Sequence, residues 1–270
     1  MNSESASICR LINAERDNRP YPVYLSAVRN PLPCEYRDFL TERETHAYFD
    51  KKTIKTKQNY LLGRYALKLA SCAYMNKTKM SMIETDTGVL RYPFIQASDP
   101  HIPDVSLTHT DTVALALAFP RGHDSGIDIE YVRREKENVY DRIMNEDEHK
   151  ILEAIGDEKL RLECMVWTMK EALSKAVHCG FTVPFEILSI KSFDKKNLSD
   201  AGSTYEAFFT HFGQFKGHGT FCGNWAVSVV MPYNTSFPAS WAEELSLAEL
   251  PKILSAVRLA AEAEDHTVHQ

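Results

Sequence analysis

The sequence predicts an α/β (α+β) protein made of two similar, pseudo-symmetric halves, each a small β-sheet with helices packed on it, and a cleft between the halves. Two observations predict this fold. Helical and strand periodicities alternate along the chain, and their order repeats once. The predicted parts are an N-terminal half (1–122), a C-terminal half (123–237) and a C-terminal helical tail (238–270).

The composition is that of a globular protein, with 44% hydrophobic and 25% charged residues among 270. No segment approaches the roughly 20 apolar residues of a membrane span, and the first residues are polar, so we expect a cytoplasmic protein that does not enter a membrane. The six cysteines form no C-x-x-C pair and are expected to be reduced thiols. A net charge of -6 argues against a nucleic-acid binder.

In the first half, Thr41 and Glu44 have the spacing of a capping box and predict a helix over 41–50. A second helix is expected over 58–75, where apolar residues recur on one face. The Gly- and Pro-rich segment 85–104 predicts loops and short strands. VALALAF at 113–119 alternates large apolar residues with alanine and predicts a strand with one well-filled face.

The second half follows the same order. GIDIEYV at 126–132 predicts a strand, Asn145 and Glu148 predict a capped helix, a long helix is expected over 159–178, and NWAVSVVM at 224–231 predicts a strand. Glu44 and Glu148 are 104 residues apart, and Ala66-Leu67 precedes Ala172-Leu173 by 106. We therefore expect a duplicated unit, joined at the turn-rich segment 120–124, with a polar tail that frays.

Asp128 and Glu130 are the first candidate site residues. They lie two apart on a predicted strand, so both carboxylates project from one face. A hard cation such as Mg²⁺ would explain two like charges at this distance. The alternative is the acidic outer face of a half-exposed strand.

Trp167, Glu171 and Lys175 form the second candidate, because their i, i+4, i+8 spacing places them on one stripe of a helix. An ordinary Glu–Lys helix pair, worth only about 0.2–0.5 kcal/mol, is the alternative. The tryptophan on the same stripe favours a partly buried, functional face.

Two further segments could meet a phosphate. Thr108 and His109 in SLTHTD lie at the entrance to the predicted strand 113–119. The stretch 51–68 carries six basic residues and no acidic one, which suits either a solvated helix face or a bound polyphosphate.

Together, G-I-D-I-E at 126–130, W-T-M-K-E-A-L-S-K at 167–175 and S-L-T-H at 106–109 resemble the signatures of Sfp-type 4′-phosphopantetheinyl transferases, within the holo-acyl-carrier-protein synthase superfamily. The resemblance covers roughly residues 38 to 231. It implies a monomer of two pseudo-symmetric α/β halves.

The resemblance also implies residue roles. Asp128, Glu130 and Glu171 would bind Mg²⁺ (or Mn²⁺), and Glu171 would also be the catalytic base. Lys175, as a second catalytic residue, and Lys170 would neutralise phosphate charge. The residues that would hold coenzyme A are Thr108 and His109, with Lys57, Arg64 and Arg91 at the nucleotide 3′-phosphate. Lys55 could replace Lys57, and Thr108 stands where the family usually has serine.

The implied activity is transfer of 4′-phosphopantetheine from coenzyme A to a serine of an apo acyl or peptidyl carrier protein, with release of adenosine 3′,5′-bisphosphate. It would serve fatty-acid, polyketide or nonribosomal peptide synthesis. Two alternatives stay open: a metal-dependent phosphohydrolase of nucleotides or coenzyme A, and a non-catalytic protein that binds coenzyme A or a carrier.

Overall fold

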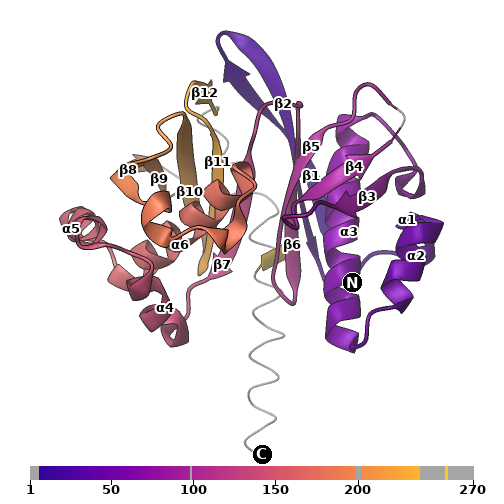
Figure 1. Ribbon diagram of the computed structural model, residues 1–270, viewed down its shortest axis with the longest axis horizontal. Helices are drawn as coiled ribbons and strands as arrows, with labels where there is room; N and C mark the ends of the chain where they lie inside the picture. The colour runs from indigo at the N-terminus through magenta and orange to yellow at the C-terminus, as the bar shows by residue number, and fades with distance from the viewer. Residues whose placement is uncertain (1–5, 98, 199–201, 238–252, 255–270) are drawn as a thin grey trace, which may run out of the picture.

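The computed structural model describes residues 6–97, 99–198, 202–237 and 253–254. Two sheets stand next to each other, and each has a long helix against it (Figure 1). The predicted fold class is confirmed. The helical tail predicted for 238–270 lies outside the described residues, apart from Ile253 and Leu254.

The first half contains a five-stranded antiparallel sheet in the order β12-β1-β2-β6-β5 and a separate β3-β4 hairpin. Its elements are β1 (Ser7–Arg16), β2 (Arg19–Arg29), α1 (Tyr36–Phe39), α2 (Glu42–Phe49), α3 (Ile54–Tyr74), η1 (Met80–Met82), β3 (Glu84–Thr87), β4 (Pro93–Gln96), β5 (Asp104–His109) and β6 (Val113–Phe119).

The second half contains an antiparallel sheet in the order β7-β11-β10-β9-β8. Its elements are β7 (Gly126–Tyr131), η2 (Arg134–Lys136), α4 (Glu137–Arg142), α5 (Glu146–Ile155), α6 (Lys159–Ala176), η3 (Gly180–Thr182), η4 (Phe185–Leu188), β8 (Ile190–Leu198), β9 (Gly202–Phe209), β10 (Phe215–Cys222) and β11 (Trp225–Pro232). The short β12 (Thr235–Ser236) then crosses back and pairs with β1 of the first sheet.

Three apolar clusters hold these layers together. The central cluster joins the facing sides of the two sheets, with residues from β1, β2 and β6 on one side and from β7 and β11 on the other. A second cluster lies under α3, and a third lies under α6. The alternation in VALALAF follows from this arrangement, because its large side chains enter the central cluster and its alanines face α3.

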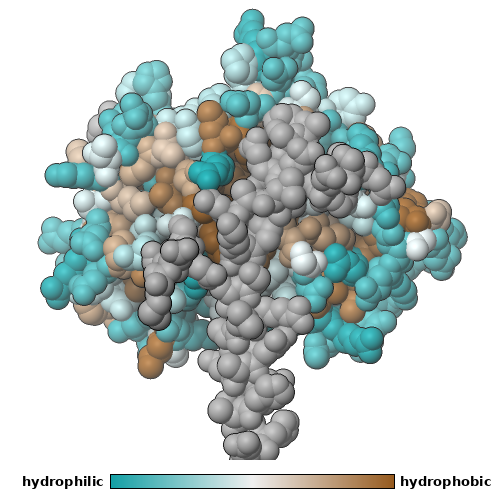
Figure 2. Space-filling model, turned by 180° about the vertical axis from the view of Figure 1, so that it is seen from behind, coloured by the Kyte–Doolittle hydropathy of each residue, from teal (hydrophilic) through white to brown (hydrophobic). Residues whose placement is uncertain are grey.

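Polar and apolar residues are unevenly distributed over the surface. Seen from behind, the margins of the molecule are mostly hydrophilic and the hydrophobic residues gather toward its middle (Figure 2). Within the described part of the chain, no helix has both the length and the apolar character needed to cross a membrane. All six cysteines are free thiols, as predicted.

The two halves share a buried lysine–glutamate pair. Lys68 on α3 pairs with Glu44, the capping glutamate of α2, and also donates to the carbonyl of Phe39 at 2.7 Å. Lys170 on α6 pairs with Glu148, the capping glutamate of α5, at 2.8 Å, and donates to the carbonyl of Ile143 at 2.6 Å. Both lysines are almost completely buried, so each pair ties the start of a short helix to the middle of a long one.

This equivalence corrects one detail of the predicted repeat. Lys68 and Lys170 are 102 residues apart, whereas the Ala-Leu pairs that the sequence aligns are 106 apart. The difference of four residues is about one helical turn, so the Ala-Leu match places the two long helices one turn out of register.

The capped helices and the strands at β6, β7 and β11 agree with the sequence-based expectation. Helix α3 begins at Ile54 rather than 58, because Thr53 and Thr56 form a capping box there, and α6 ends at Ala176 rather than 178. The β1-β2 hairpin was missed. Its signal is the two-residue turn Asp17-Asn18, whose positive φ values of 52° and 60° suit a type I′ hairpin.

Candidate active site

A large cleft separates the two halves and encloses about 1420 Å³. Its first-half wall comes from α3, the β3-β4 turn and the end of β5, and its second-half wall from β7, the residues after it, α6 and Trp225. This volume exceeds that of a typical small-molecule pocket, so the cleft has room for a nucleotide and part of a second protein.

The floor of the cleft is a seam between β5 and β7. The hydroxyl of Ser106 accepts a hydrogen bond from the backbone N–H of Ile127 at 3.2 Å, and that of Thr108 accepts from Ile129 at 3.4 Å. Thr108 also donates to Asp128 Oδ1 at 2.8 Å. Thr108 therefore acts in this structure on a carboxylate and a backbone amide of the other half.

Gly126 sets the distance between α6 and β7. A Cβ built at this position would lie 1.9 Å from the carbonyl oxygen of Ala172, which no side chain can tolerate. The contact brings the end of α6 onto the strand. Lys175 Nζ then reaches Asp128 Oδ1 at 2.7 Å and the carbonyl of Ile127 at 3.1 Å.

The three predicted metal ligands, Asp128, Glu130 and Glu171, all line the cleft. Two of them are paired with cations: Asp128 with Lys175, and Glu130 with Lys136 at 2.7 Å. Among the described residues they are not a set whose ligand atoms all lie within 4.8 Å of one another. A metal ion bound by Asp128 and Glu130 would therefore have to displace the ammonium groups of Lys175 and Lys136.

Glu171 differs from the other two because, in the part of the chain described, no hydrogen bond or ion pair reaches its carboxylate. Burial, and then the negative charge of Asp128, raise its pKa to about 7, while Lys175 opposes the shift. Hard carboxylate oxygens beside an open cleft are the donors that Mg²⁺ prefers, and Mg²⁺ usually completes its shell with water and phosphate oxygens. The donor set therefore fits this ion.

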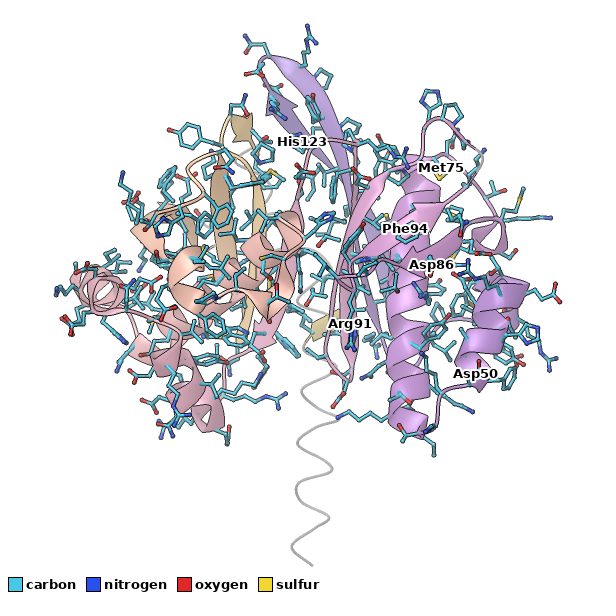
Figure 3. The ribbon with its side chains drawn as sticks, in the orientation of Figure 1. Asp50, Met75, Asp86, Arg91, Phe94 and His123 are labelled. Carbon is cyan, nitrogen blue, oxygen red and sulfur yellow. The ribbon has the colours of Figure 1, made fainter. Side chains whose placement is uncertain are left out.

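Three predicted phosphate-binding residues also line the cleft: Arg64 on α3, Arg91 in the β3-β4 turn and His109 at the end of β5. Figure 3 places Arg91 in the middle of the molecule, where the two halves face each other. The guanidinium of Arg64 lies 5.0 Å from the ring centre of Tyr60. His109 is open to solvent within the cleft, yet desolvation by the cleft walls lowers its pKa.

Two predicted residues are not brought to the cleft. The Lys170 side chain is 1% exposed and pairs with Glu148 on α5. The structure therefore does not place its ammonium group where a phosphate could reach it. Lys57 lies over the rings of Tyr48 and Phe49, at 5.4 and 5.7 Å. Lys55, the alternative to Lys57, pairs at 2.7 Å with Asp111, which does line the cleft.

Lys51, the first residue of the basic stretch 51–68, lines the cleft. Several other lining residues were missed, namely Arg133 and Lys136, with the aromatic residues Tyr131 and Trp225. Arg133 and Lys136 follow β7 directly, and such a cluster of bases after an acidic strand is a signal that could have found them. Trp225 gives no such signal, because its approach to Tyr131, 5.0 Å between ring centres, depends on the pairing of β11 with β7.

An α/β protein with carboxylates on one wall of a cleft and arginines on the other is suited to phosphate chemistry. Residues 125–230, which include G-I-D-I-E and W-T-M-K-E-A-L-S-K, match the model of the 4′-phosphopantetheinyl transferase superfamily. The match supports phosphopantetheinyl transfer in general. No curated protein matches the chain significantly.

Proposed function

We propose that the protein is an Sfp-type enzyme that transfers 4′-phosphopantetheine from coenzyme A to a serine of an apo carrier protein, with Mg²⁺ bound. The observation that carries the proposal is the position of Glu171. Its unpaired carboxylate faces the cleft within the superfamily segment, next to Asp128 and Lys175 and across from Arg64 and Arg91.

Asp128 and Glu171 would hold the metal ion, with Glu130 as a third ligand once Lys136 gives way. Mn²⁺ suits the same oxygen donors. When bound, the ion would neutralise charge on the pyrophosphate oxygens of coenzyme A. Lys175 stands beside Asp128 and would neutralise the negative charge that develops as adenosine 3′,5′-bisphosphate leaves.

Glu171 is the proposed general base. In the metal-free protein the pKa of Glu171 is about 7. With the ion bound, the carboxylate would be ionised, and one of its two oxygens would accept the proton. It would take the proton of the carrier serine hydroxyl as the serine oxygen bonds to the β-phosphorus. The bond from this phosphorus to adenosine 3′,5′-bisphosphate breaks, and the nucleotide carries away the electron pair.

The first half would grip the nucleotide. Arg64, Arg91 and His109 line its wall of the cleft and can meet phosphate oxygens. We propose that Lys51, which lines the cleft, takes the role that the family resemblance implied for Lys57. Thr108 would act through Asp128, because its hydroxyl donates to that carboxylate.

We further propose that the enzyme is a cytoplasmic monomer whose partners are coenzyme A and an apo acyl or peptidyl carrier, and that it binds no nucleic acid. Fatty-acid, polyketide and nonribosomal peptide carriers all present a serine to be modified.

Intact-protein mass spectrometry tests the proposal. The protein is incubated with coenzyme A, Mg²⁺ and each of a panel of apo carriers, and one carrier should gain the mass of phosphopantetheine. Hydrolysis of coenzyme A without any gain in carrier mass would support a phosphohydrolase, and binding without turnover would support a non-catalytic protein. Either result would overturn the proposed transfer.

A further inference from the structure

A second group of metal-ligating side chains lies outside the cleft, where α4, α5 and α6 meet. It consists of Asp141 on α4, His149 on α5 and Glu163 on α6, and one potential ligand atom of each lies within 4.8 Å of the others. In the described residues, no other group of three meets this spacing. Glu163 precedes Glu171 by eight residues, or about 12 Å along the helix, so this group is separate from the proposed active site.

Glu163 is the unusual member. Its side chain is 0% exposed, and neither carboxylate oxygen has a hydrogen-bond partner in the described structure. Lys159 Nζ forms an ion pair with Oε1 at 3.3 Å, but the lysine side chain is 66% exposed, so this one charged partner lies largely in solvent. Burying a carboxylate with so little compensation is costly, and a cation shared with Asp141 and His149 would offset that cost.

The other two residues, His149 and Asp141, already lie close to each other. His149 Nε2 lies 3.6 Å from Asp141 Oδ1, close to the separation of two ligands on one tetrahedral ion. Asp141 is 59% exposed, so its carboxylate lies at the surface end of the group while Glu163 forms the buried end. Lys159, on the outer surface of α6, can swing into solvent.

We propose that Asp141, His149 and Glu163 bind one divalent transition-metal ion, for which Zn²⁺ is the best match. An imidazole nitrogen with two carboxylate oxygens suits Zn²⁺, whereas Mg²⁺ and Ca²⁺ prefer oxygen ligands alone. Water would fill the fourth position. The ion would join three helices, and α5 also supplies Glu148 to Lys170, the residue before Glu171.

A titration of the full-length chain, without a histidine tag, tests the site. Co²⁺ serves as the spectroscopic probe, because four-coordinate Co²⁺ absorbs visible light, and Zn²⁺ serves in calorimetry. The wild type should bind one equivalent with the Co²⁺ spectrum of a four-coordinate site. His149→Ala and Glu163→Gln should weaken binding by at least about tenfold.

Two matched variants complete the test. His211→Ala removes an exposed histidine of the same half and should bind Zn²⁺ like the wild type. Glu171→Gln removes a carboxylate of the cleft and should leave the four-coordinate Co²⁺ spectrum of the three-helix group unchanged. Circular dichroism checks that every variant is folded. Failure of the wild type to bind one equivalent would overturn the proposal, and so would equal binding by His149→Ala, Glu163→Gln and the wild type.

Discussion

The two halves of this molecule have the same frame but contribute different residues to the cleft. Strands β2-β6-β5 of the first sheet correspond in order to β7-β11-β10 of the second, and each half has the buried lysine–glutamate pair. At the same offset of 102 residues as the two lysines, Ser26 on β2 corresponds to Asp128 on β7. The Ser26 hydroxyl donates to the carbonyl of Ala66, whereas Asp128 faces the cleft and pairs with Lys175.

The equivalent positions on the long helices differ in the same way. Glu171 and Lys175 on α6 correspond to Leu69 and Ala73 on α3, so the first half lacks the acidic site although it retains the scaffold. The first half instead contributes Arg64, Arg91 and His109 to its wall of the cleft. Both halves therefore keep the buried lysine–glutamate pair that joins their helices, while the site residues differ at a few neighbouring positions.

The largest expected effect is on kcat and concerns Glu171 in the second half. Glu171→Gln should lower kcat for phosphopantetheine transfer by about 10²- to 10⁴-fold, because the amide cannot accept the serine proton. Leu69→Ala, at the equivalent position of α3, should leave kcat nearly unchanged. Steady-state kinetics of both variants, with thermal unfolding as a folding control, check this contrast. Comparable kcat values for Glu171→Gln and the wild type would remove Glu171 from the chemistry.

The next largest expected effect is on stability and concerns the buried lysine–glutamate pairs. Lys68→Met and Lys170→Met each leave a buried glutamate without its cation, and each should reduce the free energy of unfolding by about 3–5 kcal/mol. Urea denaturation measures both losses, and Lys77→Met, which breaks an exposed ion pair, is the control. A Lys170→Met variant that kept full stability but lost coenzyme A binding would restore the phosphate role predicted for Lys170.

Substitutions of the first-half arginines should affect coenzyme A binding more than turnover. Arg64→Ala and Arg91→Ala should each raise KM for coenzyme A by about 10- to 100-fold, with a smaller change in kcat, since each removes a cation that is proposed to bind a phosphate. Arg121→Ala, an exposed arginine outside the cleft, serves as the control. A fall in kcat alone would place these arginines in the chemical step.

The smallest expected effect is the pH dependence of metal binding. Because the pKa of Glu171 is about 7 in the metal-free protein, protons compete with the ion below that pH, and Mg²⁺ affinity should fall by up to about tenfold per pH unit. Calorimetric Mg²⁺ titrations at pH 6 and pH 8 measure the change. Glu171→Gln should flatten it, and an unchanged pH dependence in that variant would assign the titration to another group.

The same shift has a consequence for stability. The folded protein binds a proton at Glu171 more tightly than the unfolded chain, whose glutamate has a pKa near 4.5. The metal-free protein should therefore lose stability as pH rises from about 4.5 to about 7 through this group, and a bound cation should offset the loss. Thermal unfolding with and without Mg²⁺ across this range tests the sign.

Local patterns predicted much of this structure because they depend on neighbours in sequence. The capping boxes at Thr41 and Asn145, the alternation at 113–119 and the spacing of Glu171 and Lys175 are all of this kind. They located the second-half wall of the cleft. The division into halves 1–122 and 123–237 remains a prediction, since β12 of the second half completes the first sheet.

Features that depend on long-range pairing were not predictable. The phosphate role assigned to Lys170 overlooked its pairing with Glu148, which is 22 residues away on another helix. Thr108 could be placed near a phosphate, but its bond to Asp128 requires β5 to meet β7. Arg64 and Glu171 face the same cleft only because the two sheets share one apolar core.

The most direct test of the account compares the two products of the proposed reaction in a single incubation with coenzyme A, Mg²⁺ and an apo carrier. The account predicts that adenosine 3′,5′-bisphosphate, measured by chromatography, appears in a one-to-one ratio with carrier protein that has gained phosphopantetheine. Omitting the carrier should abolish both products. Release of the nucleotide without modified carrier, or in its absence, would contradict the central claim that this cleft transfers phosphopantetheine to a protein.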